Sequence, residues 1–169
     1  MSRPGWRWAA AALGTAVRVA LGLLWINEGA IKLRSGFGGS DILLVADGAA
    51  ENGRVPEYFQ LFASTILHGQ AELFGFVTPL MEIGLGVALV AGILTGPVAL
   101  ASLATLLMYW SADQLIEEYP VMALLSGLVL GFSATCSRVS ATSAVIRALR
   151  TRHGALAGVL ERPGVRRWL

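Results

Sequence analysis

The chain has 169 residues, of which 55% are hydrophobic and only 14% are charged, and its mean hydropathy is +0.64. This balance excludes an ordinary water-soluble domain and is typical of an integral membrane protein. The single cysteine, Cys136, excludes an internal disulfide, a cysteine-ligated iron–sulfur cluster and a C-x-x-C dithiol relay.

Four apolar stretches approach or exceed the length of about 20 helical residues that crosses the hydrocarbon core of a bilayer. They lie at residues 9–33, 69–94, 97–116 and 121–137. The first stretch is too long for a cleaved signal peptide. Gly96 and Pro97 predict a tight turn between the second and third stretches. The sequence therefore predicts an all-α, integral membrane four-helix bundle over residues 1–138.

Glycines are frequent in the first two stretches. Six of them are expected to let the two helices approach closely: Gly14, Gly22, Gly29, Gly84, Gly86 and Gly92.

Basic residues are concentrated at the two ends of the chain. Nine of the thirteen flank the first and last stretches: Arg3, Arg7, Arg138, Arg147, Arg150, Arg152, Arg162, Arg166 and Arg167. By the positive-inside rule both termini are cytoplasmic. The connection at residues 34–67 then lies outside, and we expect it to form a cap that contains short helices over the mouth of the bundle.

Residues 139–169 form a basic cytoplasmic tail. The spacing of Val139, Val145, Ile146 and Leu149 among the arginines predicts an amphipathic helix that lies on anionic lipid. A solvated basic tail without membrane contact fits the same residues nearly as well. In the absence of a nucleic-acid module, lipid is the expected partner and nucleic acid is not.

Ionisable residues occur within or at the edges of the apolar stretches: Arg18, Glu28, Lys32, Glu72, Glu82 and Asp113. Charged side chains are costly in hydrocarbon, so we expect them to face the bundle interior and to have partners. Counted at ~1.5 Å per residue, Arg18 and Glu82 both fall near the midplane of the bilayer, and a buried ion pair between them is expected. Such a pair fits helix docking at least as well as function.

The remaining ionisable residues lie closer to the outer face, with aromatic and amide side chains at similar depth. They predict a polar pocket beneath the cap, formed by Glu28, Lys32, Glu72, Asp113, Tyr109, Trp110 and Gln114. This pocket could bind a quinone head group or a small anion, or relay protons through its carboxylates. Glu28 and Lys32, four residues apart, equally fit a local ion pair.

Several chemistries have no signal in the sequence. His68 and His153 fall at opposite membrane faces, so a haem held by two histidines is not expected. No nucleotide-binding loop, serine nucleophile elbow or zinc motif occurs, and no metal site is expected. No individual catalytic residue can be assigned.

The first two stretches carry a pattern of polar residues and glycines: Arg18-x6-Trp25-x2-Glu28-Gly29-x2-Lys32, then Pro79-x2-Glu82-x-Gly84-x-Gly86 and Gly92-x-Leu94-Thr95. Over roughly residues 15–135 the chain resembles the DoxX and DoxD-like family of small bacterial membrane proteins. The resemblance implies a four-helix bundle in the bacterial cytoplasmic membrane. It also implies association with oxidoreductases, because DoxD-like members are subunits of thiosulfate:quinone oxidoreductase and DoxX-like members organise membrane complexes with soluble redox enzymes.

The first functional hypothesis is therefore a small membrane subunit of a quinone-linked respiratory or sulfur oxidoreductase complex. It would not be catalytic alone, would contact larger redox proteins, and would bind quinone without any covalently attached cofactor. Two alternatives remain open: a purely structural accessory subunit of a respiratory-chain complex, and a small-molecule or ion permease.

Overall fold

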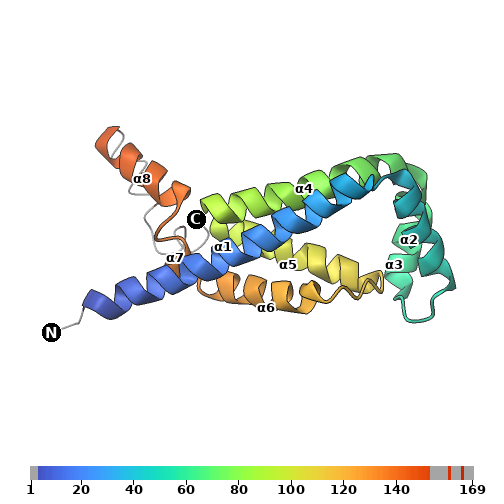
Figure 1. Cartoon of the computed structure of the whole chain (residues 1–169), viewed down its shortest axis with the longest axis horizontal. Coiled ribbons are helices and arrows are strands. Elements are labelled where there is room, and N and C mark those ends of the chain that lie inside the picture. Colours follow the sequence, from blue (N-terminus) through green and yellow to red (C-terminus); the bar gives the residue numbers. More distant parts are fainter. Residues whose placement is uncertain (1–3, 153–159, 161–164, 166–169) are drawn as a thin grey trace.

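A computed structural model describes residues 4–152 together with residues 160 and 165, and every regular element in these ranges is a helix. Four long helices lie side by side: α1 (Pro4–Ser35), α4 (Ala71–Ala91), α5 (Thr95–Ser111) and α6 (Glu118–Gly131) (Figure 1). At one end lie α2 (Gly39–Glu51) and α3 (Glu57–Phe62), which continue through the π-helical segment η1 (Ala63–Leu67) and the 3-10 segment η2 (His68–Gln70) into α4. At the other end lie α7 (Ser133–Cys136) and α8 (Ala141–Arg152).

Helices α1 and α4 pack backbone against backbone. A Cβ atom added to Gly22 would lie 2.7 Å from the carbonyl oxygen of Gly86, and one added to Gly29 would lie 2.6 Å from that of Pro79. These glycines leave no room for a side chain, as expected of small residues between closely packed helices. They also fix the register of the two antiparallel helices, with Gly22 opposite Gly86 and Gly29 opposite Pro79.

Of the six glycines predicted to let the first two long helices approach closely, Gly22, Gly29 and Gly86 lie in the contact between α1 and α4. The prediction is wrong for Gly14, which lies against Cys136 of α7, and for Gly92, which follows α4 and lies beside Ser140 and the Arg18 side chain. Gly84 does not lie in the contact either. An added Cβ atom there would meet nothing within 4 Å. The prediction is wrong for this residue because two positions along a helix correspond to a rotation of about 200°, so Gly84 faces away from the side on which Gly86 packs.

The turn between α4 and α5 lies earlier in the chain than predicted. Helix α4 ends at Ala91, because Gly92 adopts the left-handed conformation with φ 70° and the Ile93 amide returns to the Ala88 oxygen at 2.9 Å. Helix α5 begins at Thr95, so that Gly96 and Pro97 belong to its first turn. The predicted boundaries at residues 94 and 97 are therefore wrong by two or three residues.

Other helix ends also differ from the predicted boundaries. Helix α1 begins at residue 4 rather than 9, and α5 ends at Ser111 rather than 116, followed by Asp113 with φ 57°. The apolar stretch at residues 121–137 is divided by Phe132 into α6 and α7. A helix is present at Ala141–Arg152 in the predicted tail. Arg162, Arg166 and Arg167 of that tail lie outside the described residues.

The space between the long helices contains polar groups as well as apolar side chains. Leu21, Trp25, Leu89, Met122 and Val129 belong to one buried cluster. Within it the Trp25 indole donates to the Ser102 hydroxyl at 2.7 Å, which in turn lies 2.7 Å from the Ser126 hydroxyl. A second buried cluster joins α2, α3 and η1, and includes Ile42, Phe59 and Leu67.

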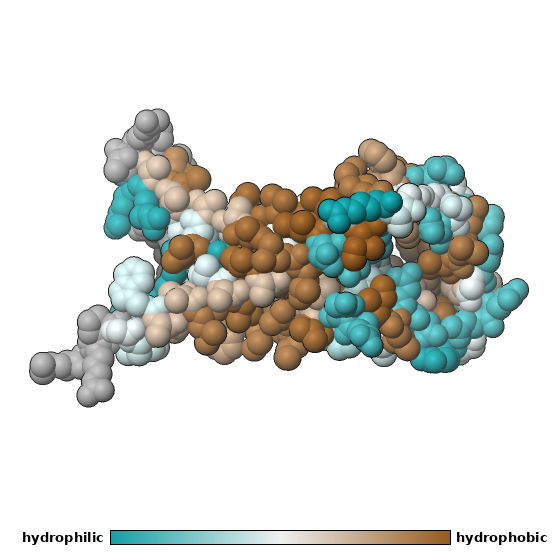
Figure 2. Space-filling view, viewed as in Figure 1, coloured by the Kyte–Doolittle hydropathy of each residue, from teal (hydrophilic) through white to brown (hydrophobic). Residues whose placement is uncertain are grey.

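The outer surface of the long helices is apolar. Figure 2 shows hydrophobic residues along the middle of the molecule and hydrophilic residues towards both ends. Two helical stretches, Gly5–Ser35 and Glu57–Ala91, are long and apolar enough to cross a membrane, and Glu118–Gly131 is a shorter apolar helix.

Candidate functional site

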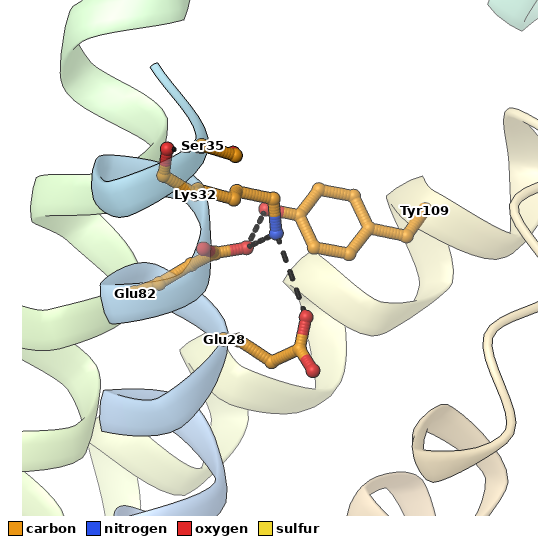
Figure 3. A network of polar contacts seen from close by, with 5 residues as sticks. All are labelled: Glu28, Lys32, Ser35, Glu82 and Tyr109. Carbon is orange, nitrogen blue, oxygen red and sulfur yellow. Dashed lines mark hydrogen bonds and ion pairs between the residues drawn. The ribbon is translucent and has the colours of Figure 1, made fainter. Parts of the chain in front are cut away.

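Four polar side chains from three helices meet near the end of the bundle that carries α2 and α3 (Figure 3). Lys32 Nζ on α1 lies 2.5 Å from Glu82 Oε1 on α4 and 3.7 Å from Glu28 Oε2, one turn away on α1. The hydroxyl of Tyr109 on α5 donates to the same Glu82 Oε1 at 2.6 Å. We call Glu28, Lys32, Glu82 and Tyr109 the charged cluster.

Helix register brings the charged cluster together. Because Gly29 packs against Pro79 and Ile83, Glu82 lies at the level of Glu28 and Lys32 across the α1–α4 contact. Tyr109 lies in the last turn of α5 and stacks on Tyr119 of α6, with ring centroids 5.4 Å apart.

The charged cluster holds two carboxylates and one ammonium group. Glu82 is fully buried, and its Oε2 has no hydrogen-bond partner among the described residues. Glu28 is 8% exposed. The cluster therefore has one carboxylate more than it has ammonium groups, and Lys32 lies within 4 Å of both carboxylates.

A cavity of about 240 Å³ adjoins the charged cluster. Lys32 and Tyr109 form part of its wall, and the rest is mainly apolar and comes largely from α2, α3, α4 and α5. Four phenylalanines line it: Phe37, Phe59, Phe62 and Phe74. Lys32 Nζ lies 6.0 Å from the Phe37 ring centroid and 5.3 Å from that of Tyr109. The cavity thus offers aromatic walls together with an ammonium and a phenol at one side.

The predicted ion pair between Arg18 and Glu82 is wrong. Arg18 instead donates to the backbone oxygens of Leu89, Val90, Cys136 and Val139. Arg18 lies beside Gly92, where an added Cβ atom would be 2.7 Å from Arg18 Nη1. Gly92 follows Glu82 by ten residues in the chain, so Arg18 and Glu82 lie at different levels of the bundle. The depth estimate failed because α1 extends past α4, so that the middle of α1 is not level with the middle of α4.

Asp113, also predicted to lie in the pocket, has other partners. Its side chain accepts a hydrogen bond from Asn52 Nδ2 at 2.8 Å and lies 3.0 Å from Arg54 Nη2. Both partners belong to the connection between α2 and α3, so Asp113 holds that connection against the end of α5. Neither of these bonds of the Asp113 side chain reaches the charged cluster.

The other predicted pocket residues are dispersed. Trp110 is 67% exposed. Gln114 lines the aromatic cavity and also a surface groove between α5 and α6. The Glu72 carboxylate lies at the start of α2, where a Cβ atom on Gly39 would be 2.4 Å from it. Glu28, Lys32 and Tyr109 are therefore the three predicted pocket residues that meet in the charged cluster, and the local Glu28–Lys32 ion pair is confirmed at 3.7 Å.

Two features of the site were missed from the sequence. Glu82 belongs to the charged cluster, and phenylalanines from α3, from α4 and from the turn between α1 and α2 line the adjacent cavity. Aligning Gly22 with Gly86 as the point of closest helix contact would have placed Glu82 within two residues of Glu28 across the two helices. The sequence carries no comparable signal for the aromatic lining, because the positions of the phenylalanines depend on how the segment before α4 folds back.

No protein-family model, curated protein or solved structure matches the chain. The resemblance to the DoxX and DoxD-like family therefore stays a prediction. Within the residues that the structure describes, no group of three or more histidine, cysteine, aspartate or glutamate side chains is placed to hold a metal ion.

Proposed function

We propose that the chain is a multi-pass membrane protein in which the four long helices cross the bilayer. Large apolar side chains are exposed on each of them: Leu23 and Ile31 on α1, Leu80 and Val87 on α4, Leu100 and Leu107 on α5, and Leu124 and Leu128 on α6. Polar side chains such as Glu82, Ser102 and Ser126 are buried between them. Water disfavours so extensive an apolar surface, whereas lipid solvates it.

The two shorter helices are compatible with this arrangement. Helix α5 has 17 residues, which corresponds to roughly 25 Å, and a bilayer adapts to a helix a few ångströms shorter than its hydrocarbon core. Helices α6 and α7 together extend from Glu118 to Cys136.

The distribution of charge favours one orientation. Arg7, Arg138 and Arg147 lie towards the end that carries the N-terminus and α8, whereas Asp47 and Glu57 lie at the end formed by α2 and α3 (Figure 1). The positive-inside rule then places both termini in the cytoplasm and α2 with α3 outside, as an outer cap.

We further propose that the protein is a quinone-binding small subunit of a respiratory or sulfur-linked oxidoreductase complex, of the DoxX and DoxD-like kind. The aromatic cavity beside the charged cluster carries this proposal. A buried cavity of ~150 Å³ accommodates benzene, so about 240 Å³ is sufficient for a substituted ring. Lys32, whose ammonium carries three N–H groups, offers a donor to a ring carbonyl oxygen, and the Tyr109 ring lies beside it in the cavity wall.

Filling the cavity tests this proposal. Val45 on α2 lines the cavity, so Val45→Trp is expected to weaken binding of a short-chain ubiquinone analogue at least about tenfold, or ~1.4 kcal/mol. Binding is measured by titration calorimetry on the purified protein in neutral detergent.

Leu44→Trp provides the matched control, because Leu44 is the preceding residue on α2 and is 72% exposed. It should bind the analogue with wild-type affinity. Absence of quinone binding by the wild-type protein, or equal affinity of the Val45→Trp variant, would contradict a quinone site in this cavity.

A second candidate, a structural accessory subunit, is favoured by a different feature. An apolar groove of about 440 Å³ runs between α5 and α6 and includes Leu103, Leu107, Trp110 and Pro120. Such a groove on a lipid-facing surface suits a transmembrane helix of a partner protein. If the purified chain binds no quinone but retains a larger redox protein in mild detergent, the structural candidate is supported over the quinone-binding one.

A further inference from the structure

A cavity of about 620 Å³ lies at the opposite end of the molecule from the charged cluster, between α1, the end of α4 and the start of α8. Three arginines line it: Arg18 from α1, Arg138 from the segment before α8, and Arg147 from α8. Trp8, Val19 and Val90 contribute apolar surface to the same wall. We call this cavity the arginine groove.

Arg18 is held in place without a counter-ion. Its side chain is almost completely buried, with 2% of the residue exposed, yet its hydrogen bonds go to four backbone oxygens and to no carboxylate. Carbonyl dipoles orient a guanidinium group but do not cancel its charge. The four bonds use four of the five N–H groups of the side chain, so one donor is left for a ligand.

The other two arginines add charge without an acidic neighbour. Arg138 and Arg147 are exposed, and neither forms an ion pair with any described residue. No aspartate or glutamate is among the residues that line the arginine groove. Three positive charges around one hollow attract an anion, and guanidinium groups match the oxygens of a phosphate by paired hydrogen bonds.

The residues around the arginine groove suit a bound amphiphile better than a free anion. Val19 and Val90 line its wall, and Trp8, Leu13 and Val139 present large apolar side chains to the outside. Tryptophan and arginine at this level are typical of the boundary between lipid head groups and acyl chains. An anion bound here would have apolar protein surface directly beside it.

We propose that the arginine groove binds the phosphate of an anionic phospholipid, with the acyl chains lying along the apolar surface of α1 and α4. This inference depends on the proposed membrane insertion but not on quinone binding. Basic pockets on the cytoplasmic side of membrane helices recognise lipid head groups through the same chemistry. A zwitterionic lipid is disfavoured, because its ammonium group would face three arginines.

The test uses the delipidated full chain in neutral detergent, with retention of added lipid measured by native mass spectrometry. The wild-type protein is expected to retain phosphatidylglycerol in preference to phosphatidylcholine. The double variant Arg138→Gln/Arg147→Gln should lose about tenfold or more in phosphatidylglycerol affinity, because two of the three charges are removed. Arg18 is left unchanged so that its bonds to the backbone, and the fold, are preserved.

The matched control is Arg7→Gln/Arg34→Gln, which removes the same charge from two exposed residues of α1 outside the arginine groove. It should retain phosphatidylglycerol within about twofold of wild type. Equal retention of phosphatidylcholine, equal losses in the two double variants, or displacement of the lipid by millimolar inorganic phosphate would each overturn the proposal. Quinone binding, measured at the other end of the molecule, should be unchanged in both double variants, so the two proposals can fail separately.

Discussion

The Lys32→Met variant is expected to lose about 3–5 kcal/mol in free energy of unfolding, the cost of removing one partner from a buried ion pair. Lys32 is the cation within 4 Å of both Glu28 and Glu82. Without it, two carboxylates face each other in the interior, and Glu82 is fully buried. Unfolding of the purified protein in mixed micelles, followed by circular dichroism, measures the loss.

Two further variants identify the cause of this loss. Adding Glu82→Gln to Lys32→Met removes one of the two stranded carboxylates, so the double variant should be more stable than Lys32→Met alone. Arg34→Met removes a positive charge from an exposed residue two positions along α1 and should change stability by no more than about 0.5 kcal/mol. If the losses from Lys32→Met and Glu82→Gln are simply additive, the charged cluster is not the source of stabilisation.

The Gly86→Ala variant is expected to separate α1 from α4 locally, with a loss of about 1–3 kcal/mol typical of overpacking. The added Cβ atom would lie 2.5 Å from the Gly22 oxygen and 2.8 Å from the Ile26 amide nitrogen. Both atoms belong to the backbone, so neither can move without shifting the helix. The same unfolding measurement applies.

Gly84→Ala is the matched control, because it introduces the same methyl group on the same helix where nothing lies within 4 Å. Alanine is the better helix former by about 1 kcal/mol, so this variant should be as stable as the wild type or slightly more so. Equal losses in the two alanine variants would show that close contact between α1 and α4 is not what Gly86 provides.

The sequence predicts the helices better than their ends. Apolar length predicts all four long helices, because each of them contributes apolar side chains to the buried cluster between them. The end of α4 was misplaced because Gly92 and Gly96 are both plausible stops, and Thr142 favours the first by donating from its hydroxyl to the Gly92 oxygen at 3.0 Å. The position of this turn therefore depends on a residue fifty positions away in the chain, and the local sequence pattern carries no information about that contact.

Prediction of the site was limited by the same lack of long-range information. Glu28 and Lys32 lie one turn apart on a single helix, so their contact follows from the sequence alone. The partner of Glu82 depends on the register between α1 and α4, which the contact of Gly22 with Gly86 fixes. The sequence predicts a carboxylate partner for Arg18 because buried charges are usually paired, but backbone oxygens near the ends of α4 and α7 accept its hydrogen bonds instead.

Labelling of single cysteines in spheroplasts tests the central claim, that the four long helices cross a membrane with α2 and α3 outside. Ser64 in η1 and Arg150 in α8 are exposed at opposite ends, and the native Cys136 is buried. A membrane-impermeant maleimide should label the Ser64→Cys variant in intact spheroplasts and the Arg150→Cys variant only after permeabilisation. Equal labelling of both variants before permeabilisation, or recovery of the chain in the soluble fraction, would contradict the proposed topology.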